Sequence, residues 1–201
     1  MVTGGCGTGT SYWWSKIENS GLYNKYGSAI KTGYVKYRSK TAVTCYDLNV
    51  IAPIGEIMLG LGINFEMNTI DKIDIKSPEA SSIIYDQKFR IEKVFGMVEI
   101  PLQKEIIKGF IVDLQARFGF FGYSGVDREN FFGQAPMPST YFIGFGPVAN
   151  YRIIPHTYVY FMPSCEYKYF HNNLNEYPVK ITHKMWTFIA TAGIRIDVSR
   201  R

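Results

Sequence analysis

Apolar residues and polar or small residues alternate strictly along several stretches of this chain. In residues 59–67 the apolar positions are Leu59, Leu61, Ile63, Phe65 and Met67, and the positions between them are Gly60, Gly62, Asn64 and Glu66. Successive side chains of a β-strand point to opposite faces, so a repeat of two residues predicts a strand with one apolar and one polar face. The same pattern occurs within 46–52, 95–102, 110–122 and 186–198. No stretch shows a convincing helical repeat.

The alternation and the segments between the alternating stretches predict eight strands in a single domain, residues 1–201. The strands are expected at 2–14, 41–53, 56–68, 88–102, 107–122, 139–153, 157–170 and 184–198. The first has the weakest pattern, and residues 31–38 are an alternative for its place. Short connections at 53–55, 103–108 and 154–156 alternate with long polar loops at about 15–40, 68–87, 123–139 and 171–183. This layout is typical of an up-and-down barrel whose long loops gather at one end.

The apolar face of such a barrel can point in either of two directions. In a soluble, lipocalin-like barrel it points inward, whereas in a membrane barrel it meets lipid. A face that meets water is usually rich in long charged side chains, but the polar faces here are rich in small residues. Examples are Gly60, Gly62, Gly144, Gly146 and Ser164. Small residues suit a crowded interior, so the pattern favours an all-β fold, an eight-stranded antiparallel up-and-down transmembrane β-barrel.

Charged residues of both signs lie on the same faces as these small residues. They are Asp47, Glu66, Glu99, Asp113, Arg117, Arg152, Glu166, Lys168, Arg195 and Asp197. An isolated charge inside a barrel is very costly, so we expect these side chains to pair in a network within the interior. The strands flanking the turn at 154–156 predict that Arg152 and Glu166 are neighbours. Because eight strands enclose room only for side chains, the network is expected to be a plug and not a pore.

Aromatic residues make up 16% of the chain and gather near the predicted strand ends. The clusters lie at 12–14, 120–123, 141–142, 169–170 and Trp186. Trp and Tyr are enriched at the two interfaces of a bilayer, so we interpret the clusters as aromatic girdles. The predicted strands are also somewhat longer than the roughly 9–11 residues that a strand needs to cross hydrocarbon.

Little in the sequence points to catalysis, a cofactor or a nucleic acid. The net charge is +5, but the basic residues are scattered along the chain and do not form a phosphate-binding patch. His156, His171 and His183 match no standard metal-site spacing. No Ser is adjacent to His183 to suggest a hydrolase site. We therefore expect no catalytic residues, no metal site, no cofactor and no enzyme activity.

The three cysteines are far apart in the sequence and include no Cys-x-x-Cys pair. Their odd number argues against a full disulfide framework, and a bridge between Cys45 and Cys165 is an open alternative. No run approaches 18 apolar residues, so no transmembrane helix is expected. Residues 1–10 have neither the basic start nor the apolar core of a secretory signal, so we expect no export signal in this chain.

Several segments resemble a known family. Val98-Glu99-Ile100-Pro101-Leu102, followed by a short turn and an alternating strand, resembles the Glu-Ile-Pro-Leu segment of porin-like outer-membrane β-barrel proteins that are abundant in Bacteroidota. The paired segments 142–153 and 160–170, and the segment 193–198, are similar to other strands of that family. The resemblance covers about residues 41–198. It implies an eight-stranded barrel in a bacterial outer membrane, and it implies no particular substrate.

We predict a small outer-membrane barrel with a plugged polar interior and a structural or surface-interaction role. The lipid bilayer is its expected partner, and its long extracellular loops are expected to contact proteins or ligands. No nucleic acid is expected to bind. The first alternative is a narrow porin-like channel for ions or small solutes. The second is a soluble lipocalin-like barrel that binds an apolar ligand.

Overall fold

The computed structural model describes residues 1–18, 40–76, 81–126, 134–135, 140–174 and 179–198. These residues form nine strands: β1 (Val2–Glu18), β2 (Lys40–Ile54), β3 (Ile57–Lys76), β4 (Ser81–Ile107), β5 (Phe110–Gly125), β6 (Gln134–Ala135), β7 (Tyr141–Ile154), β8 (Thr157–Leu174) and β9 (Val179–Ile196). Within these ranges there is no helix long and apolar enough to cross a membrane.

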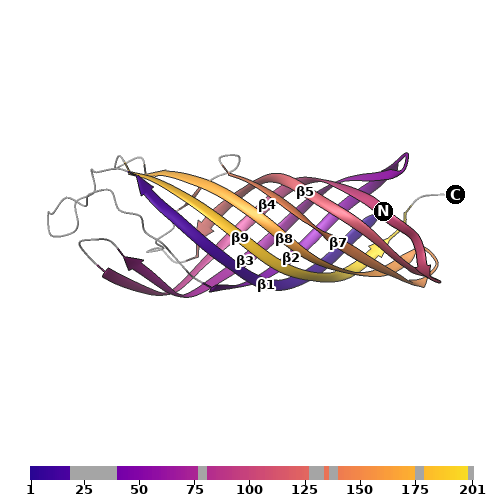
Figure 1. The fold of residues 1–201 in the computed structure, drawn as a ribbon, viewed down its shortest axis with the longest axis horizontal. Helices are drawn as coiled ribbons and strands as arrows, with labels where there is room; N and C mark the ends of the chain where they lie inside the picture. The colour runs from indigo at the N-terminus through magenta and orange to yellow at the C-terminus, as the bar shows by residue number, and fades with distance from the viewer. Residues whose placement is uncertain (19–39, 77–80, 127–133, 136–139, 175–178, 199–201) are drawn as a thin grey trace.

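Eight of the strands in the described residues close into a barrel (Figure 1). Neighbouring strands follow the order β4-β3-β2-β1-β9-β8-β7-β5, and a β4–β5 pairing closes the ring. Each pairing is antiparallel, and the two-residue β6 only extends the sheet beside β5. The predicted eight-stranded antiparallel barrel is confirmed. β1 pairs with both β2 and β9 and is therefore the first strand, whereas the alternative segment 31–38 lies outside the described residues.

The strands run beyond their predicted bounds at the end of the barrel where long loops were expected. β3 and β4 stay paired as far as Lys76 and Ser81, and β8 and β9 stay paired to their outer ends. The loops predicted at 68–87 and 171–183 are therefore wrong over most of their length. Strands that project from a bilayer meet water, so they lose the apolar alternation that marks a strand in sequence. Most of the other two predicted loops, 15–40 and 123–139, lies outside the described residues.

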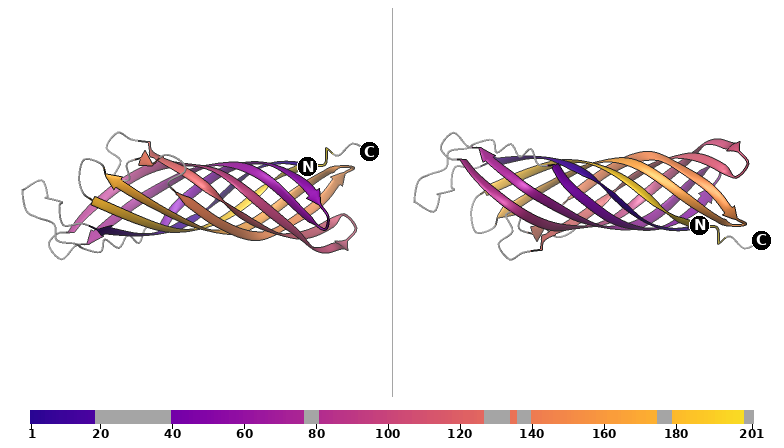
Figure 2. Two further views of the ribbon diagram at one scale, coloured as in Figure 1. Left: turned by 90° about the horizontal axis from the view of Figure 1, so that it is seen from above. Right: turned by 90° about the horizontal axis from the view of Figure 1, so that it is seen from below.

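Short turns join the strands at the opposite end, where β1 begins and β9 ends (Figure 2). In the turns before β3 and β5, Gly55 and Gly109 have φ of 64° and 85°, which glycine adopts without steric cost. In the turn before β8, Pro155 precedes His156, which has φ of 65°. A proline followed by a residue of positive φ is the pattern of a type II turn. We refer to this end as the turn end and to the other as the loop end.

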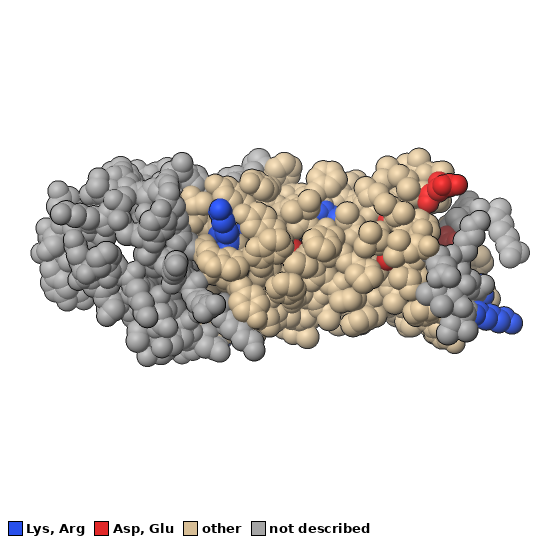
Figure 3. All heavy atoms as spheres, viewed as in Figure 1, with Lys and Arg blue, Asp and Glu red and all other residues tan. Residues whose placement is uncertain are grey.

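The outer wall of the barrel is apolar between its two ends. Leu61, Phe118, Ile143 and Phe145 on this wall are 56–71% exposed. Where side chains are described, the charged ones on the outer wall lie near the ends, at Glu56, Lys88, Arg90, Glu92, Lys108 and Lys184. The face seen in Figure 3 likewise carries few charges between its ends. An apolar wall around a polar interior is the architecture of a bilayer-spanning barrel, so the alternative of a soluble barrel with an apolar interior is wrong.

The aromatic clusters divide between the two faces of the wall. Tyr12, Trp14, Tyr141 and Trp186 are 38–50% exposed on the outside. Tyr141 stacks on Tyr169 of the neighbouring strand, with 5.1 Å between ring centroids. The inward-facing members of the clusters are Trp13, Phe121, Tyr123, Phe142 and Phe170. Only part of the predicted girdle therefore meets the bilayer interface, because strand alternation turns every second ring into the lumen.

The seam between β7 and β8 is interrupted near the middle of the wall. Three consecutive pairs are missing around Pro147 and Pro163, although the register is the same on either side of the gap. Both prolines keep their pairing with the strand on their other side. Proline has no N–H, so this geometry places both ring nitrogens in the β7–β8 seam, where neither can donate. An apolar groove of about 530 Å³ lies on the outer surface over this part of the seam.

Candidate functional site

An aromatic layer crosses the lumen toward the loop end. Trp13 of β1 packs edge-on against Phe89 of β4 and Phe170 of β8, with ring centroids 4.7 and 5.4 Å apart. Phe121 of β5 also contacts Phe170 edge-on, and His183 of β9 stacks on Phe170 at 4.4 Å. These five side chains are at most 2% exposed. They come from five strands, so together they form an apolar barrier across the lumen.

A cluster of four charges lies inside the wall next to this layer. Lys93 of β4 contacts Glu66 of β3, and its Nζ lies 2.5 Å from Glu166 Oε2 of β8. Lys168 Nζ, also on β8, lies 3.0 Å from an oxygen of each of the same two carboxylates. Lys168 also donates to Thr187 Oγ1 at 2.9 Å. All four charged side chains are at most 2% exposed, and two positive charges balance two negative ones.

A second ion pair joins opposite parts of the ring. Arg117 Nη1 of β5 lies 3.2 Å from Asp47 Oδ2 of β2, and Asn64 donates to the other oxygen of Asp47 at 2.5 Å. Arg117 also donates through Nε to Gln115 Oε1 at 2.5 Å. Its guanidinium lies over the ring of Phe95, 5.1 Å from the centroid. A guanidinium held on three sides in this way is fixed in the middle of the lumen.

The third cluster lies toward the turn end. Arg195 of β9 donates to both oxygens of Glu99 of β4, at 2.6 and 2.8 Å. Asp113 of β5 is farther from the guanidinium, 3.6 Å from Nη1. Asn150 of β7 donates to Asp113 at 2.8 Å, and Gln115 donates to Glu99 at the same distance. Two carboxylates therefore share one guanidinium here.

The structure places eight of the ten sequence-predicted charged residues in the lumen, each at most 5% exposed. Asp197 is half-buried at the turn end. The prediction for Arg152 is wrong, since its side chain is exposed beside the β7–β8 turn. Arg152 keeps the strand register opposite Tyr158, but it lies at the open turn end of the barrel, where an inward position no longer means burial.

The predicted neighbourhood of Arg152 and Glu166 is also wrong. Arg152 pairs with Tyr158, whereas Glu166 pairs with Gly144. Tyr158 and Glu166 are eight residues apart on β8, which is roughly 26 Å along a strand. The partners of Glu166 are instead Lys93 and Lys168.

Lys93 is an interior cation that the predicted set lacks. It lies six residues before Glu99 on the same strand, an even separation that puts both side chains on one face. This even spacing could have identified Lys93 as an inward-facing residue, but the strand was predicted from its apolar residues alone. Lys93 supplies the charge that lets Glu66 and Glu166 lie side by side.

Glycines make room for the larger interior side chains. Tyr160 of β8 lies across Gly5 of β1 and Gly193 of β9, where an added Cβ would collide with the tyrosine. An added Cβ at Gly144 would lie 2.9 Å from Cγ of Glu166. The small residues on the polar faces therefore have a steric role in a narrow lumen.

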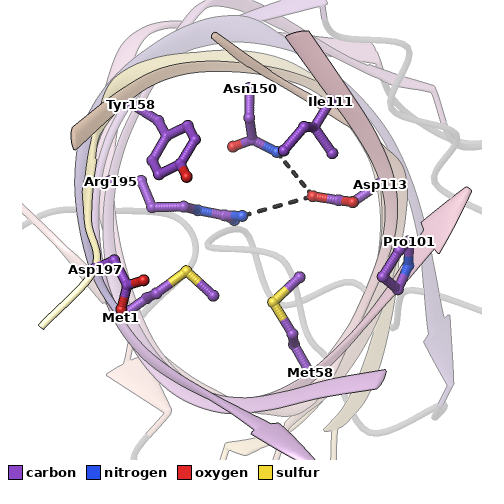
Figure 4. Close-up of a pocket in the computed structure, with 9 residues that line it drawn as sticks. All are labelled: Met1, Met58, Pro101, Ile111, Asp113, Asn150, Tyr158, Arg195 and Asp197. Atoms are coloured by element: carbon purple, nitrogen blue, oxygen red, sulfur yellow. Dashed lines mark hydrogen bonds and ion pairs between the residues drawn. The ribbon is translucent and has the colours of Figure 1, made fainter. Parts of the chain in front are cut away.

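A cavity of about 290 Å³ lies inside the turn end (Figure 4). Its lining includes Met58, Ile111, Asp113, Asn150, Tyr158 and Arg195. Met58, Ile111 and Tyr158 each follow closely after one of the three short turns. The cavity is thus on the turn-end side of the charge clusters, and the aromatic layer is on their other side.

The residues that the structure describes contain neither a candidate metal site nor a disulfide bond. None of their His, Cys, Asp and Glu side chains form a group of three that could hold a metal ion. Cys45 is buried in the lumen, whereas Cys165 belongs to the outer face and is half-buried. Both are free thiols, so the bridge left open by the sequence does not form.

No family model and no curated protein sequence matches the chain. Among solved structures, it is similar to the outer membrane protein OprG from Pseudomonas aeruginosa, with 11% identity, a TM-score of 0.49, and coverage of 98% of this chain and 95% of that chain. It is also similar to the outer membrane protease OmpT from Escherichia coli, with 12% identity, a TM-score of 0.46, and coverage of 97% and 96%. A third similar structure is the outer membrane protein Ail of Yersinia pestis, with 16% identity, a TM-score of 0.33, and coverage of 96% of this chain and 99% of that chain. At these scores, the fold and its place in a membrane rest on the geometry of this chain itself.

Proposed function

We propose that this protein is a small barrel of the bacterial outer membrane whose lumen is plugged, with a structural or surface-interaction role. The observation that carries the proposal is the filling of the lumen. The aromatic layer and the three charge clusters succeed one another between the loop end and the turn-end cavity. The proposal includes no enzyme activity, although the structural neighbour OmpT is a protease.

Paired charges in a lumen this narrow are a barrier to ions. An ion that passed between Lys93, Glu66 and Glu166 would have to separate side chains that are in direct contact. Breaking a buried pair costs about 3–5 kcal/mol. The aromatic layer adds an apolar step on the loop-end side. A plug therefore fits the described residues better than the alternative of a narrow channel.

Conductance in planar bilayers tests the proposal. The purified protein, inserted from detergent, is expected to give no current steps above those of the lipid alone. A control variant with Trp13→Ala, Phe170→Ala and Lys93→Ala removes side chains from two layers and is expected to give current steps if it folds. Heat-modifiable gel migration checks that both proteins are folded. Regular current steps from the wild-type protein would establish the channel alternative instead.

The surface role depends on which end of the barrel faces outward. We propose that the loop end is extracellular and the turn end periplasmic, as in outer-membrane barrels with long outer loops. In a cysteine-free variant, a cysteine in place of Val126, which is 53% exposed at the loop end, should react with a membrane-impermeant maleimide on intact cells. A cysteine in place of Glu56, in the turn before β3, should react only after lysis. The reverse result would invert the orientation and remove the basis for a surface role.

The finer family assignment is part of the proposal. The segment Val98–Leu102 supports membership in the porin-like Bacteroidota family, and Pro101 of this segment lines the turn-end cavity. Fractionation of the native host is the direct test of location. The protein should be found with outer-membrane markers and should require detergent for extraction.

A further inference from the structure

The turn-end cavity has a surplus of negative charge on one side. Arg195 directs both of its terminal nitrogens to Glu99, so the guanidinium is neutralised by that carboxylate. Asp113 is left with a longer contact of 3.6 Å to Arg195, a hydrogen bond from Asn150, and the carboxyl group of Glu99 as a neighbour. The group formed by these two carboxylates and one guanidinium has a formal charge of −1. Asp113 lines the cavity, so the surplus charge faces its space (Figure 4).

Asn150 points a second acceptor into the same space. A carboxylate only accepts hydrogen bonds, so the amide nitrogen of Asn150 faces Asp113 and its Oδ1 faces away. In Figure 4 this oxygen is turned toward Tyr158. The side chain is 2% exposed, and Oδ1 has no hydrogen-bond partner among the described residues. A buried acceptor without a partner costs free energy unless a donor reaches it.

Apart from Asp197, which adds a second carboxylate, the rest of the lining is mainly apolar, and the cavity is closed on one side. Met58, Pro101 and Ile111 supply its apolar surface, and Tyr158 supplies an aromatic ring. The charge clusters lie between the cavity and the loop end, so a ligand must enter from the turn-end compartment. A volume of about 290 Å³ suits a molecule of few heavy atoms.

We propose that this cavity binds a small organic ammonium ion. The ammonium group donates to Asp113 and to Asn150 Oδ1, and its carbon chain lies against Met58 and Ile111. Nε of Arg195 also lacks a partner among the described residues. This N–H can donate a hydrogen bond to a hydroxyl group next to the ammonium. Amino alcohols are therefore the ligand class that satisfies the most groups in the cavity.

Methyl NMR of methionine-labelled protein in a neutral detergent tests the proposal. The methyl group of Met58 lines the cavity, and that of Met67 on the outer wall is an internal reference. Four probes of similar size are titrated: ethanolammonium, ethylammonium, propionate and 1-propanol. Ethanolammonium should shift the Met58 signal saturably and bind most tightly, followed by ethylammonium. Met67 should not move. Because this comparison needs no variant, it does not depend on how any substitution folds.

Two variants locate the binding. Asp113→Asn removes the surplus charge with little change in shape and should weaken ethanolammonium binding by about tenfold or more. Glu56→Gln makes the same change of charge at an exposed turn position of the same end and should leave the affinity unchanged. Equal or tighter binding of propionate or 1-propanol would overturn the proposal. So would the absence of saturable shifts, or equal affinity in Asp113→Asn and wild type. Bilayer conductance is independent of all these results, so a failure here is distinguishable from a failure of the proposed plug.

Discussion

Single residues in the lumen are stabilised by specific partners, and Lys93 shows this most clearly. It lies between Glu66 and Glu166, and none of the three side chains is more than 2% exposed. Strand parity alone was sufficient to predict an inward position for most of the charged residues. Parity could not give their partners, because a pair such as Lys93 and Glu166 joins strands that meet only across the closed lumen. It was also insufficient at Arg152, which keeps its pairing with Tyr158 but is exposed at the turn end of the barrel.

Replacing Lys93 with Met should destabilise the barrel by about 3–5 kcal/mol, because two buried carboxylates would then share only Lys168. Urea unfolding in detergent micelles, followed by tryptophan fluorescence, measures the change. Lys184→Met, at an exposed position of the outer wall, is the control and should change stability by less than about 0.5 kcal/mol. Adding Glu66→Gln to Lys93→Met should recover part of the loss. Equal effects of the two lysine variants would mean that the cluster contributes nothing to stability.

At the scale of strands, the alternation in sequence predicted the membrane-spanning parts well and the projecting parts poorly. The predicted strand at 56–68 begins one residue before β3, and β3 continues to Lys76. Inside the bilayer one face must be apolar, so the sequence carries a repeat of two. Beyond it, backbone pairing continues without that requirement, and the only remaining signal is weak β-propensity. The break in the β7–β8 seam was readable in principle, since Pro147 and Pro163 are each eight residues from Pro155 in the turn.

The interrupted seam should open locally more often than its neighbours. Amides of Phe145 and Ala149, on either side of the gap, should exchange hydrogen faster than those of the β8–β9 seam, whose pairing is continuous. In a Pro147→Val/Pro163→Val variant, both strands regain an N–H, and the exchange at these two amides should slow by about tenfold, as expected for hydrogen bonds of roughly 1 kcal/mol. Pro53→Val, close to a turn, should leave them unchanged. If exchange in the wild type is uniform along both seams, the interruption has no effect on opening.

The molecule as a whole is a barrel with an apolar outer wall and a polar interior, and this arrangement was the feature that the sequence predicted best. The small and charged residues on one face and the large apolar residues on the other were sufficient to choose membrane over water. The cavity at the turn end was beyond sequence reasoning. Its existence depends on the sum of many side-chain volumes, including those of Met58 and Tyr158, and not on any motif.

A charge placed on the outer wall should be harmful according to its depth in the bilayer. Ile63→Arg, near the middle of the apolar wall, should destabilise the folded protein in liposomes by about 2–4 kcal/mol. Ile54→Arg, beside the turn, should cost about 0–1 kcal/mol. Denaturant titration of the folded fraction on gels measures both. Equal and small effects at the two positions would contradict a bilayer around this wall.

The contact between Arg195 and Glu99 is also expected to constrain the order in which the strands enter the bilayer. Arg195 belongs to β9, the last strand of the barrel, and lies 96 residues from Glu99 in sequence. Among the described residues, Arg195 is the cation paired with Glu99 and Asp113, so both lack it until β9 arrives, and ionised carboxylates are poorly tolerated within hydrocarbon. Strands β4 and β5 therefore gain little by entering the bilayer ahead of the rest. Closure of the ring and neutralisation of the lumen become one event, and insertion is expected to be a single cooperative step that begins only after the whole chain has been made.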